Sequence, residues 1–301
     1  MKTTLHSLAG FVLFPIALLA TAVPLPARAA QSYDNCTGFI DTLPATISTQ
    51  GTWCLRHDLS TAITSGNAIT IATNNVTIDC NGFKLGGLAA GIDTLAYGIR
   101  ANNLLNLTIR HCNVRGFHIG IYTTGGGGHL IEHNSLDSNT VIGIDIVNTP
   151  IVFDGPSSII RANQVIDTGS ATLTHREAAY GIIAQNRVAV LDNTVNGVIA
   201  MSDAGEAWAY GIVTMYNSDG SVTGNRVRGL VGSGMGAAIG IYNGNSGYLV
   251  VRENDVQGND VINSIGVRCE NGRAIARDNI IAGFSTGIEN CLSDGNTLNP
   301  N

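Results

Sequence analysis

Two short marks alternate along the chain and constrain its fold more than any other feature. The first is an Asn that follows one apolar residue by three positions and precedes another by two, as in Val251-Arg252-Glu253-Asn254-Asp255-Val256. This position is filled by Asn81, Asn134, Asn163, Asn193, Asn225, Asn254 and Asn279, and by Cys112 in one further copy. The second mark is a Gly followed by Ile or Val, at Gly98, Gly120, Gly143, Gly181, Gly211, Gly240, Gly266 and Gly287.

The spacing of these marks predicts a stack of strand-containing repeats. Successive Gly marks lie 22, 23, 38, 30, 29, 26 and 21 residues apart, a period typical of repeat architectures. Apolar residues alternate in short runs, as at Val76 and Ile78, and show no sustained helical spacing. Each repeat is therefore expected to form one coil of a parallel β-solenoid that buries its inner face against its neighbours. The alternative is a β-sandwich with Asn residues in its turns.

The residue types at the two marks suggest what they do in a coil. Asn adopts left-handed backbone angles more readily than most residues and hydrogen-bonds locally, so it predicts a tight bend between two strands. Stacked Asn side chains can also hydrogen-bond from coil to coil along an apolar interior. Gly before the apolar pair predicts a second bend or a close approach of two backbones.

The two ends of the chain differ from the repeat. Residues 1–30 contain Lys2, an apolar stretch and Ala27-Arg28-Ala29, the pattern of a secretory signal peptide. Residues 31–66 lack the repeat and are expected to form an N-terminal cap, while residues 67–301 form the repeat domain. This organisation predicts a secreted or periplasmic protein with cleavage near Ala29.

Charge and hydropathy argue against two classes of partner. Cleavage would remove two cations and no acid, which moves the net charge from −6 to −8. An acidic domain without a basic run is a poor nucleic-acid binder. No stretch after the signal peptide is long and apolar enough to predict a membrane span. The oligomeric state is left open.

Six cysteines in an exported chain indicate disulfides. Cys80 and Cys112 hold nearly equivalent positions on neighbouring coils, as do Cys269 and Cys291. Adjacent coils are about 4.8 Å apart, which a disulfide can bridge. The remaining pair, Cys36 and Cys54, would join the entry segment to itself. Buried free thiols are the alternative, and the absence of a C-x-x-C pair gives a structural zinc site little support.

The stretch from Ala68 to Phe83, AITIATNNVTIDCNGF, resembles the first coil of secreted right-handed parallel β-helix repeat proteins. That group lies in the pectate-lyase-like superfamily and includes periplasmic carbohydrate-binding types. The resemblance continues through the later marks to about residue 290. It implies an all-β, right-handed parallel β-helix, a single-stranded solenoid of about eight to nine coils with an N-terminal cap. The catalytic motifs of polygalacturonases and pectate lyases are not matched, so whether the chain is an enzyme stays open.

Three middle coils carry long excursions at the same corner, over residues 164–180, 194–210 and 226–239. Loops grouped in this way commonly carry function. The candidates for acid–base chemistry are Glu177, Arg176, His175 and Glu206. Asp203 and Glu206 are candidates to share a cation such as Ca²⁺, although no cofactor is certain. Trp208, Tyr180, Tyr210, Tyr242 and Tyr122 are candidates to bind sugar rings.

These residues predict a secreted protein that binds acidic polysaccharide and cleaves it in a lyase-type reaction, in a groove under the long loops. The alternative is a non-catalytic solenoid for glycan binding, adhesion or envelope structure, in which the tyrosines serve as packing. A separate pair, His111 and His133, occupies one position on neighbouring coils and could stack or hold a metal.

Overall fold

The computed structural model describes residues 33, 35–149, 157–169, 178–202, 205–217, 220–234, 236–245, 248–270 and 272–299. A compact unit begins at Tyr33 and continues to the end of the chain. The predicted signal peptide, residues 1–30, lies outside the described residues. Within the described residues the regular structure is β-strand except for one short 3-10 helix, η1 (Leu88–Ala90).

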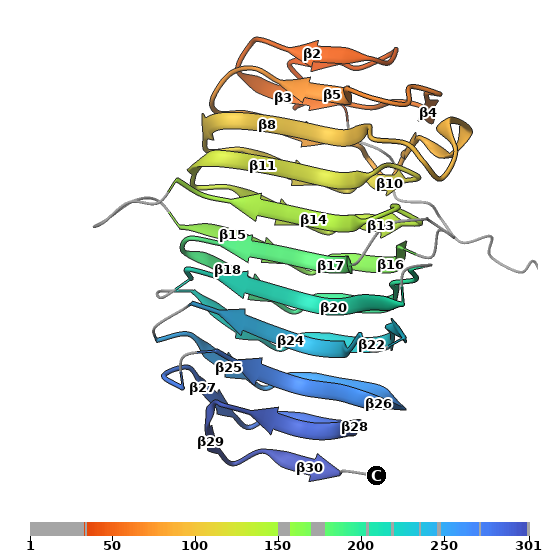
Figure 1. Cartoon of the computed structure of the whole chain (residues 1–301). Helices are drawn as coiled ribbons and strands as arrows, with labels where there is room; N and C mark the ends of the chain where they lie inside the picture. The colour runs from red at the N-terminus through yellow and green to blue at the C-terminus, as the bar shows by residue number, and fades with distance from the viewer. Residues whose placement is uncertain are drawn as a thin grey trace, which may run out of the picture. The chain divides into compact units, whose positions relative to one another are not determined.

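The strands form three columns, and each coil contributes its strands to the columns in the same order (Figure 1). The first column is an eleven-stranded sheet. It consists of β1 (Gly38–Phe39), β3 (Gly51–Cys54), β6 (Val76–Asp79), β9 (Thr108–Arg110), β12 (Leu130–Glu132), β15 (Ser158–Arg161), β18 (Val188–Leu191), β21 (Ser221–Thr223), β25 (Val250–Arg252), β27 (Ile275–Arg277) and β29 (Leu292–Asp294).

The second and third columns together make a nineteen-stranded sheet. The second contains β4 (Leu59–Ser60), β7 (Lys84–Gly86), β10 (Asn113–Arg115), β13 (Ser135–Asp137), β16 (Gln164–Gly169), β19 (Thr194–Ile199), β22 (Arg226–Val231) and β30 (Thr297–Asn299). The third contains β2 (Ala45–Ile47), β5 (Asn67–Ile71), β8 (Tyr97–Leu105), β11 (Ile119–Gly127), β14 (Ile142–Val147), β17 (Ala178–Gln185), β20 (Glu206–Met215) and β24 (Ala238–Gly244). The long strands β26 (Asp255–Cys269) and β28 (Ile280–Glu289) span both columns.

Pairing between coils is parallel throughout the three columns. The one antiparallel pair among the described strands joins β23 (Ser233–Gly234) to the start of β20. Successive parallel strands connected in this way wind with a right-handed crossover, so the chain is a right-handed parallel β-helix, as the sequence predicted. The first column is longer than the eight to nine predicted coils because β1 and β3 lie in the entry segment, which lacks the repeat marks.

The core is a narrow stack of branched apolar side chains that point into the coils. The third column places Ile99, Ile121, Ile144, Ile182, Ile212 and Ile241 inside, each fully buried. The second column contributes a matching row that includes Val165, Val195 and Val227. Inward and outward residues alternate along a strand, except that each Gly mark and the isoleucine after it both face inward. The outer face of the third column is therefore formed by the residues on either side of each Gly-Ile pair.

The predicted hydrogen bonding between Asn side chains is present as a continuous ladder. The backbone N–H and the Nδ2 of Asn163 both donate to Oδ1 of Asn193, at 2.9 and 3.0 Å. The same pair of bonds links each member to the next, through Asn134, Asn163, Asn193, Asn225, Asn254, Asn279 and Asn296. The first member of the ladder is Asn134, whose Oδ1 accepts a hydrogen bond from the backbone N–H of Cys112 on the preceding coil.

Two details of the Asn prediction were wrong. The left-handed residue of the bend is the one before the ladder Asn, for example His133 (φ 54°) or Asp192 (φ 54°). The Asn itself turns its side chain inward, where its amide satisfies buried backbone groups. Asn81 is not a member of the ladder, because two extra residues between β6 and β7 move it into the left-handed bend (φ 50°) and its Nδ2 donates to Leu55 O.

The Gly marks provide close backbone approach, the second of the two predicted roles. A Cβ added at Gly211 would lie 2.5 Å from the carbonyl oxygen of Gly240 on the next coil and 2.4 Å from Val227 Cγ1. The same close contact with the next Gly carbonyl recurs from Gly98 to Gly266. No side chain fits between these two backbones, so this corner can hold only glycine without a steric clash.

All six cysteines pair as predicted: Cys36–Cys54, Cys80–Cys112 and Cys269–Cys291. Their Cα atoms are 5.8, 4.7 and 5.1 Å apart, within the range that disulfides span. The entry segment that was predicted as a cap contributes β1 to β4 to the sheets, and its capping role stays a prediction. Among the described residues, no helix is long and apolar enough to cross a membrane.

Candidate functional site

The residues predicted for acid–base chemistry lie mostly beyond the described part of the chain. His175, Arg176, Glu177 and Asp203 are outside the described residues. Glu206 is the exposed first residue of β20, where that strand pairs with β23. No group of three or more His, Cys, Asp or Glu among the described residues is arranged to hold a metal ion. The acid–base and Ca²⁺ assignments therefore stay predictions.

The predicted aromatic residues lie together on the outward side of the third column, which we name the tyrosine face. Two rows of outward side chains cross its strands. One row is Tyr97, Ile119, Ile142, Tyr180, Tyr210, Ile239 and Ile265; the other is Arg100, Tyr122, Asp145, Ile183, Val213, Tyr242 and Arg268. Trp208 precedes Tyr210 by two residues and so lies on the same side of β20.

The aromatic rings stack on one another along the solenoid. Tyr180 and Tyr210 have ring centroids 5.1 Å apart and are nearly parallel, at 8°. Trp208 lies 6.4 Å from Tyr210 at 15°, and Tyr97 stacks on Tyr122 at 5.4 Å. Ring faces that cover each other are not free to stack on a sugar. The face therefore offers a ligand ring edges and hydroxyls, with ring faces only at the ends of each stack.

Apolar side chains fill the space between the rings. Ile183 and Val213 are buried and pack with Tyr180, Tyr210 and Tyr242. Burial is the main reason that the pKa of Tyr210 is raised to about 12, and it also raises the pKa of Tyr180 and of Tyr242. These hydroxyls therefore stay protonated at neutral pH and can donate hydrogen bonds.

Charged groups stand near both ends of the two rows. Arg100 lies over the rings of Tyr97 and Tyr122, with its guanidinium carbon 4.8 and 5.6 Å from their centroids. At the other end, Arg268 Nε is 3.6 Å from Glu289 Oε1. Tyr242 donates a short hydrogen bond to Glu270. Neither arginine was among the predicted site residues, although both hold the same position after the Gly mark as Tyr122 and Tyr242.

Asp145 is a further residue of this face that sequence reasoning missed. It lies in the row between Tyr122 and Ile183 and is 8% exposed, and its buried Oδ1 has no hydrogen-bond partner in the described part of the chain. Burial alone raises its pKa to about 7. The signal was present in the sequence, because Gly143-Ile144-Asp145 places an acid in a position that is aromatic or apolar in most other copies.

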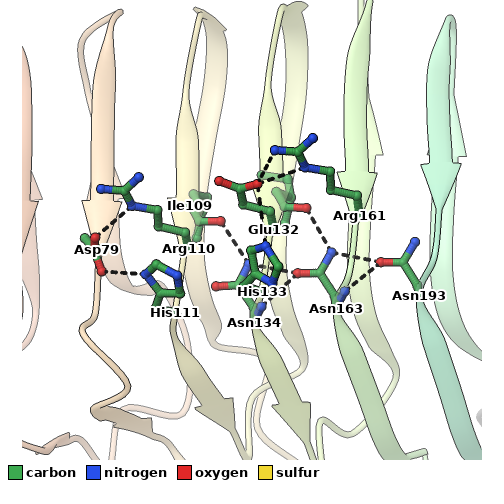
Figure 2. Close-up of polar contacts among 11 residues, drawn as sticks. Asp79, Ile109, Arg110, His111, Glu132, His133, Asn134, Arg161, Asn163 and Asn193 are labelled. Atoms are coloured by element: carbon green, nitrogen blue, oxygen red, sulfur yellow. Dashed lines mark hydrogen bonds and ion pairs between the residues drawn. The ribbon is translucent and has the colours of Figure 1, made fainter. Parts of the chain in front are cut away.

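A second polar cluster lies on the first column, at its corner with the second (Figure 2). Arg110 Nε contacts Asp79 Oδ2 at 2.7 Å, and Arg161 contacts Glu132 Oε2 at 2.7 Å. His111 stacks on His133, with centroids 5.9 Å apart, as one reading of the sequence predicted.

The His111 ring is held by the carboxylate beside it, since its Nδ1 is 3.1 Å from Asp79 Oδ1. Hydrogen bonds from Asn81 N–H, Arg110 and His111 outweigh the effect of burial and lower the pKa of Asp79. An open hollow of about 350 Å³ beside the two imidazoles is lined mainly by amide, hydroxyl and glycine groups. Although carboxylates lie beside both histidines, no three His, Cys, Asp or Glu side chains in the described part of the chain are grouped so that they could hold a metal ion at this corner.

The fold defines the class of this protein as a right-handed parallel β-helix. No protein-family model matches the sequence, and no curated protein matches it. The resemblance to the pectate-lyase-like superfamily therefore stays a prediction beyond the fold itself.

Three solved structures with some likeness have low sequence identity to this chain. The Agl-KA catalytic domain has 13% identity and a TM-score of 0.44, with 85% of this chain and 58% of that chain covered. Two Azotobacter vinelandii mannuronan C-5 epimerase A-modules follow. AlgE4 has 10% identity, a TM-score of 0.42 and coverage of 89% and 77%. AlgE6 has 12% identity, a TM-score of 0.33 and coverage of 88% and 91%. These values are too low to carry information on the activity of this chain.

Proposed function

We propose that the tyrosine face binds a polysaccharide and that acidic sugars are among the units it recognises. The observation that carries the proposal is the set of aromatic side chains on β8, β11, β17, β20 and β24, on an outward side of the solenoid. Between β11 and β17 lies β14, which contributes Ile142 and Asp145 to this face in place of an aromatic residue. Tyrosine and tryptophan combine an apolar body with a polar edge, as do sugar rings. Tyr180, Tyr210 and Trp208 are only partly buried, so part of each side chain remains accessible.

The repeating geometry favours a polymer over a small ligand. Equivalent positions on successive coils recur about every 4.8 Å along the solenoid, and stacked repeats build extended binding surfaces. The arginines near the ends of the face, Arg100 and Arg268, are suited to carboxylates because a guanidinium pairs with them through two hydrogen bonds. A secreted or periplasmic location fits this function, and three disulfides are typical of such oxidising compartments.

Lyase-type cleavage is the second candidate function. It depends on Glu177, Arg176 and His175, with Ca²⁺ at Asp203 and Glu206, and it keeps the status of a sequence prediction. A non-catalytic glycan-binding or structural solenoid is the alternative that the tyrosine face supports without these residues.

The experiment measures binding of the purified protein to oligomers of pectate, alginate and glycosaminoglycans by titration calorimetry. Trp208→Ala removes the ring at the end of the Tyr210 stack and is expected to weaken binding about tenfold, a typical loss for an aromatic contact residue. Tyr248→Ala is the matched control, because Tyr248 is 73% exposed and lies outside the face. Binding that is absent for every oligomer, or equal in the two variants, would refute the proposal.

The same samples report on cleavage. A rise in absorbance from unsaturated products, with and without Ca²⁺, that disappears in Glu177→Ala or Arg176→Ala would establish a lyase. Binding without such products would support the non-catalytic alternative.

A further inference from the structure

Three acidic side chains are buried in the described part of the chain: Asp79, Glu132 and Asp145. They are 7, 8 and 8% exposed, and all three project from a strand of the solenoid. A buried carboxylate is costly unless a cation or hydrogen bonds compensate it. The groups that compensate each acid therefore indicate which partner or ligand its surroundings can bind.

Two of the three acids have their cation on the next coil. Asp79 is paired with Arg110, and Glu132 with Arg161, each at 2.7 Å (Figure 2). In both cases the arginine is the residue in register with the acid on the neighbouring strand. The solenoid thus supplies a partner for a buried acid by placing an arginine one coil further along.

Asp145 has no such partner among the residues that the structure describes. Its register neighbours are Tyr122 on β11 and Ile183 on β17, and neither carries a charge. Among the described residues it makes no ion pair, and its Oδ1 accepts no hydrogen bond. The side chain points outward, because Ile144 and Ile146 on either side of it are fully buried inside the coil. The unpaired carboxyl therefore belongs to the ligand-facing side of the solenoid.

The groups around Asp145 are those that favour a cation. Tyr122 precedes it in the row, and Tyr180 on β17 is close enough for the carboxylate to raise the pKa of its hydroxyl. Aromatic rings attract ammonium and guanidinium groups. The face already holds one cation in this way, since Arg100 lies over Tyr97 and Tyr122.

We propose that Asp145, with Tyr122 and Tyr180, forms a subsite for a protonated amino group, so that the bound polysaccharide contains a free amino sugar. The inference rests on the proposed glycan-binding function and names a unit of its ligand. An ammonium group is compact and suits a carboxyl with little exposed surface. Ca²⁺ does not suit the subsite, because it takes six to eight oxygen ligands and the described residues offer one carboxyl here.

The test compares binding of a glucosamine hexamer, its fully N-acetylated counterpart and a uronate hexamer to the wild-type protein and to Asp145→Asn. The wild type is expected to bind the glucosamine hexamer at least tenfold more tightly than the acetylated one. Asp145→Asn is expected to lose that preference and to keep its affinity for the uronate hexamer. Glu253→Gln is the control, because it removes an exposed carboxylate that lies outside the tyrosine face and should leave the preference unchanged.

A second measurement does not depend on a variant. The carboxyl carbon of Asp145, followed by NMR, should titrate at lower pH when the glucosamine hexamer is bound, and the acetylated hexamer should leave its titration unchanged. If uronate or acetylated oligomers bind but the free amine brings no preference and no shift, this inference is wrong and the proposed function stands. If no oligomer binds, both are wrong.

Discussion

Asn193→Ala tests directly how the interior of this solenoid is stabilised. Asn193 is 1% exposed, and its Oδ1 accepts from both the backbone N–H and the Nδ2 of Asn163. Its own Nδ2 donates to Ile160 O at 2.9 Å and to Asn225 Oδ1 at 3.0 Å. The substitution leaves the coil backbone in place and removes one complete rung of the ladder.

The expected cost follows from the groups that lose their partner. Two N–H groups of Asn163 would be buried without an acceptor, at about 1–3 kcal/mol each, or about 2–6 kcal/mol in total. A single domain is typically stable by about 5–15 kcal/mol, so one rung is a large share. Asn296→Ala is the matched control. Asn296 accepts the same two bonds from Asn279 but is only partly buried, so water can replace it and the cost should be below about 1 kcal/mol.

Urea unfolding, followed by circular dichroism, measures both variants against the wild type. Amide hydrogen exchange adds a local readout, because Asn163 N–H should lose protection in Asn193→Ala. Equal midpoints for the two variants, or a loss below about 1 kcal/mol for Asn193→Ala, would refute the idea that the ladder stabilises the fold by satisfying buried amides.

Two further predictions concern Asp145 and the Gly marks. Burial raises the pKa of Asp145 to about 7, above its unfolded value of about 3.9. The free energy of unfolding that this shift contributes is therefore fully present below about pH 4 and is lost as the pH rises through about 7. The loss amounts to at most about 4 kcal/mol, from three pKa units at about 1.4 kcal/mol each, and urea midpoints of Asp145→Asn should therefore vary less between pH 4 and 8 than those of the wild type. Gly211→Ala should cost about 1–3 kcal/mol in thermal or urea unfolding, because its Cβ would lie 2.5 Å from Gly240 O. Gly287→Ala should cost less, since only the Leu298 side chain lies near that Cβ, at 3.1 Å; equal costs would contradict this account.

Much of the fold could be predicted because it is periodic. An Asn or Gly at the same place in each repeat meets its counterpart on the next coil, so stacking follows from spacing alone. The pairing of Cys80 with Cys112 and of Cys269 with Cys291 could be predicted for the same reason, as could the stacking of His111 on His133. In each case the repeat aligns residues that are distant in the chain.

The candidate site could be predicted only in part. The tyrosines were found because they recur beside the Gly marks. The outward position of Tyr122 and Tyr242 follows from strand alternation. Tyr180 and Tyr210 stand two residues before an inward Ile, and they lie on the outer side because the inward Gly mark between them and that Ile interrupts the alternation. The stacking of Tyr180 on Tyr210 was expected only in the alternative in which the tyrosines serve as packing, because ring orientation depends on the packing of both neighbours. The bend geometry was also missed. Either the Asn or the residue before it can adopt the left-handed backbone angle. The residue before it does so in this structure, because the Asn must turn its amide inward to satisfy buried backbone groups.

The sequence by itself determined the coil, its inward and outward faces and its disulfides, since each depends on a local pattern repeated at short range. Only the tertiary structure decided that Asp145 is a buried acid without a cation among the described residues, while Asp79 and Glu132 each have one. All three acids lie on strands, and the sequence does not distinguish them. The difference arises from which residue the next coil places in register, an arginine for two of them and Ile183 for the third.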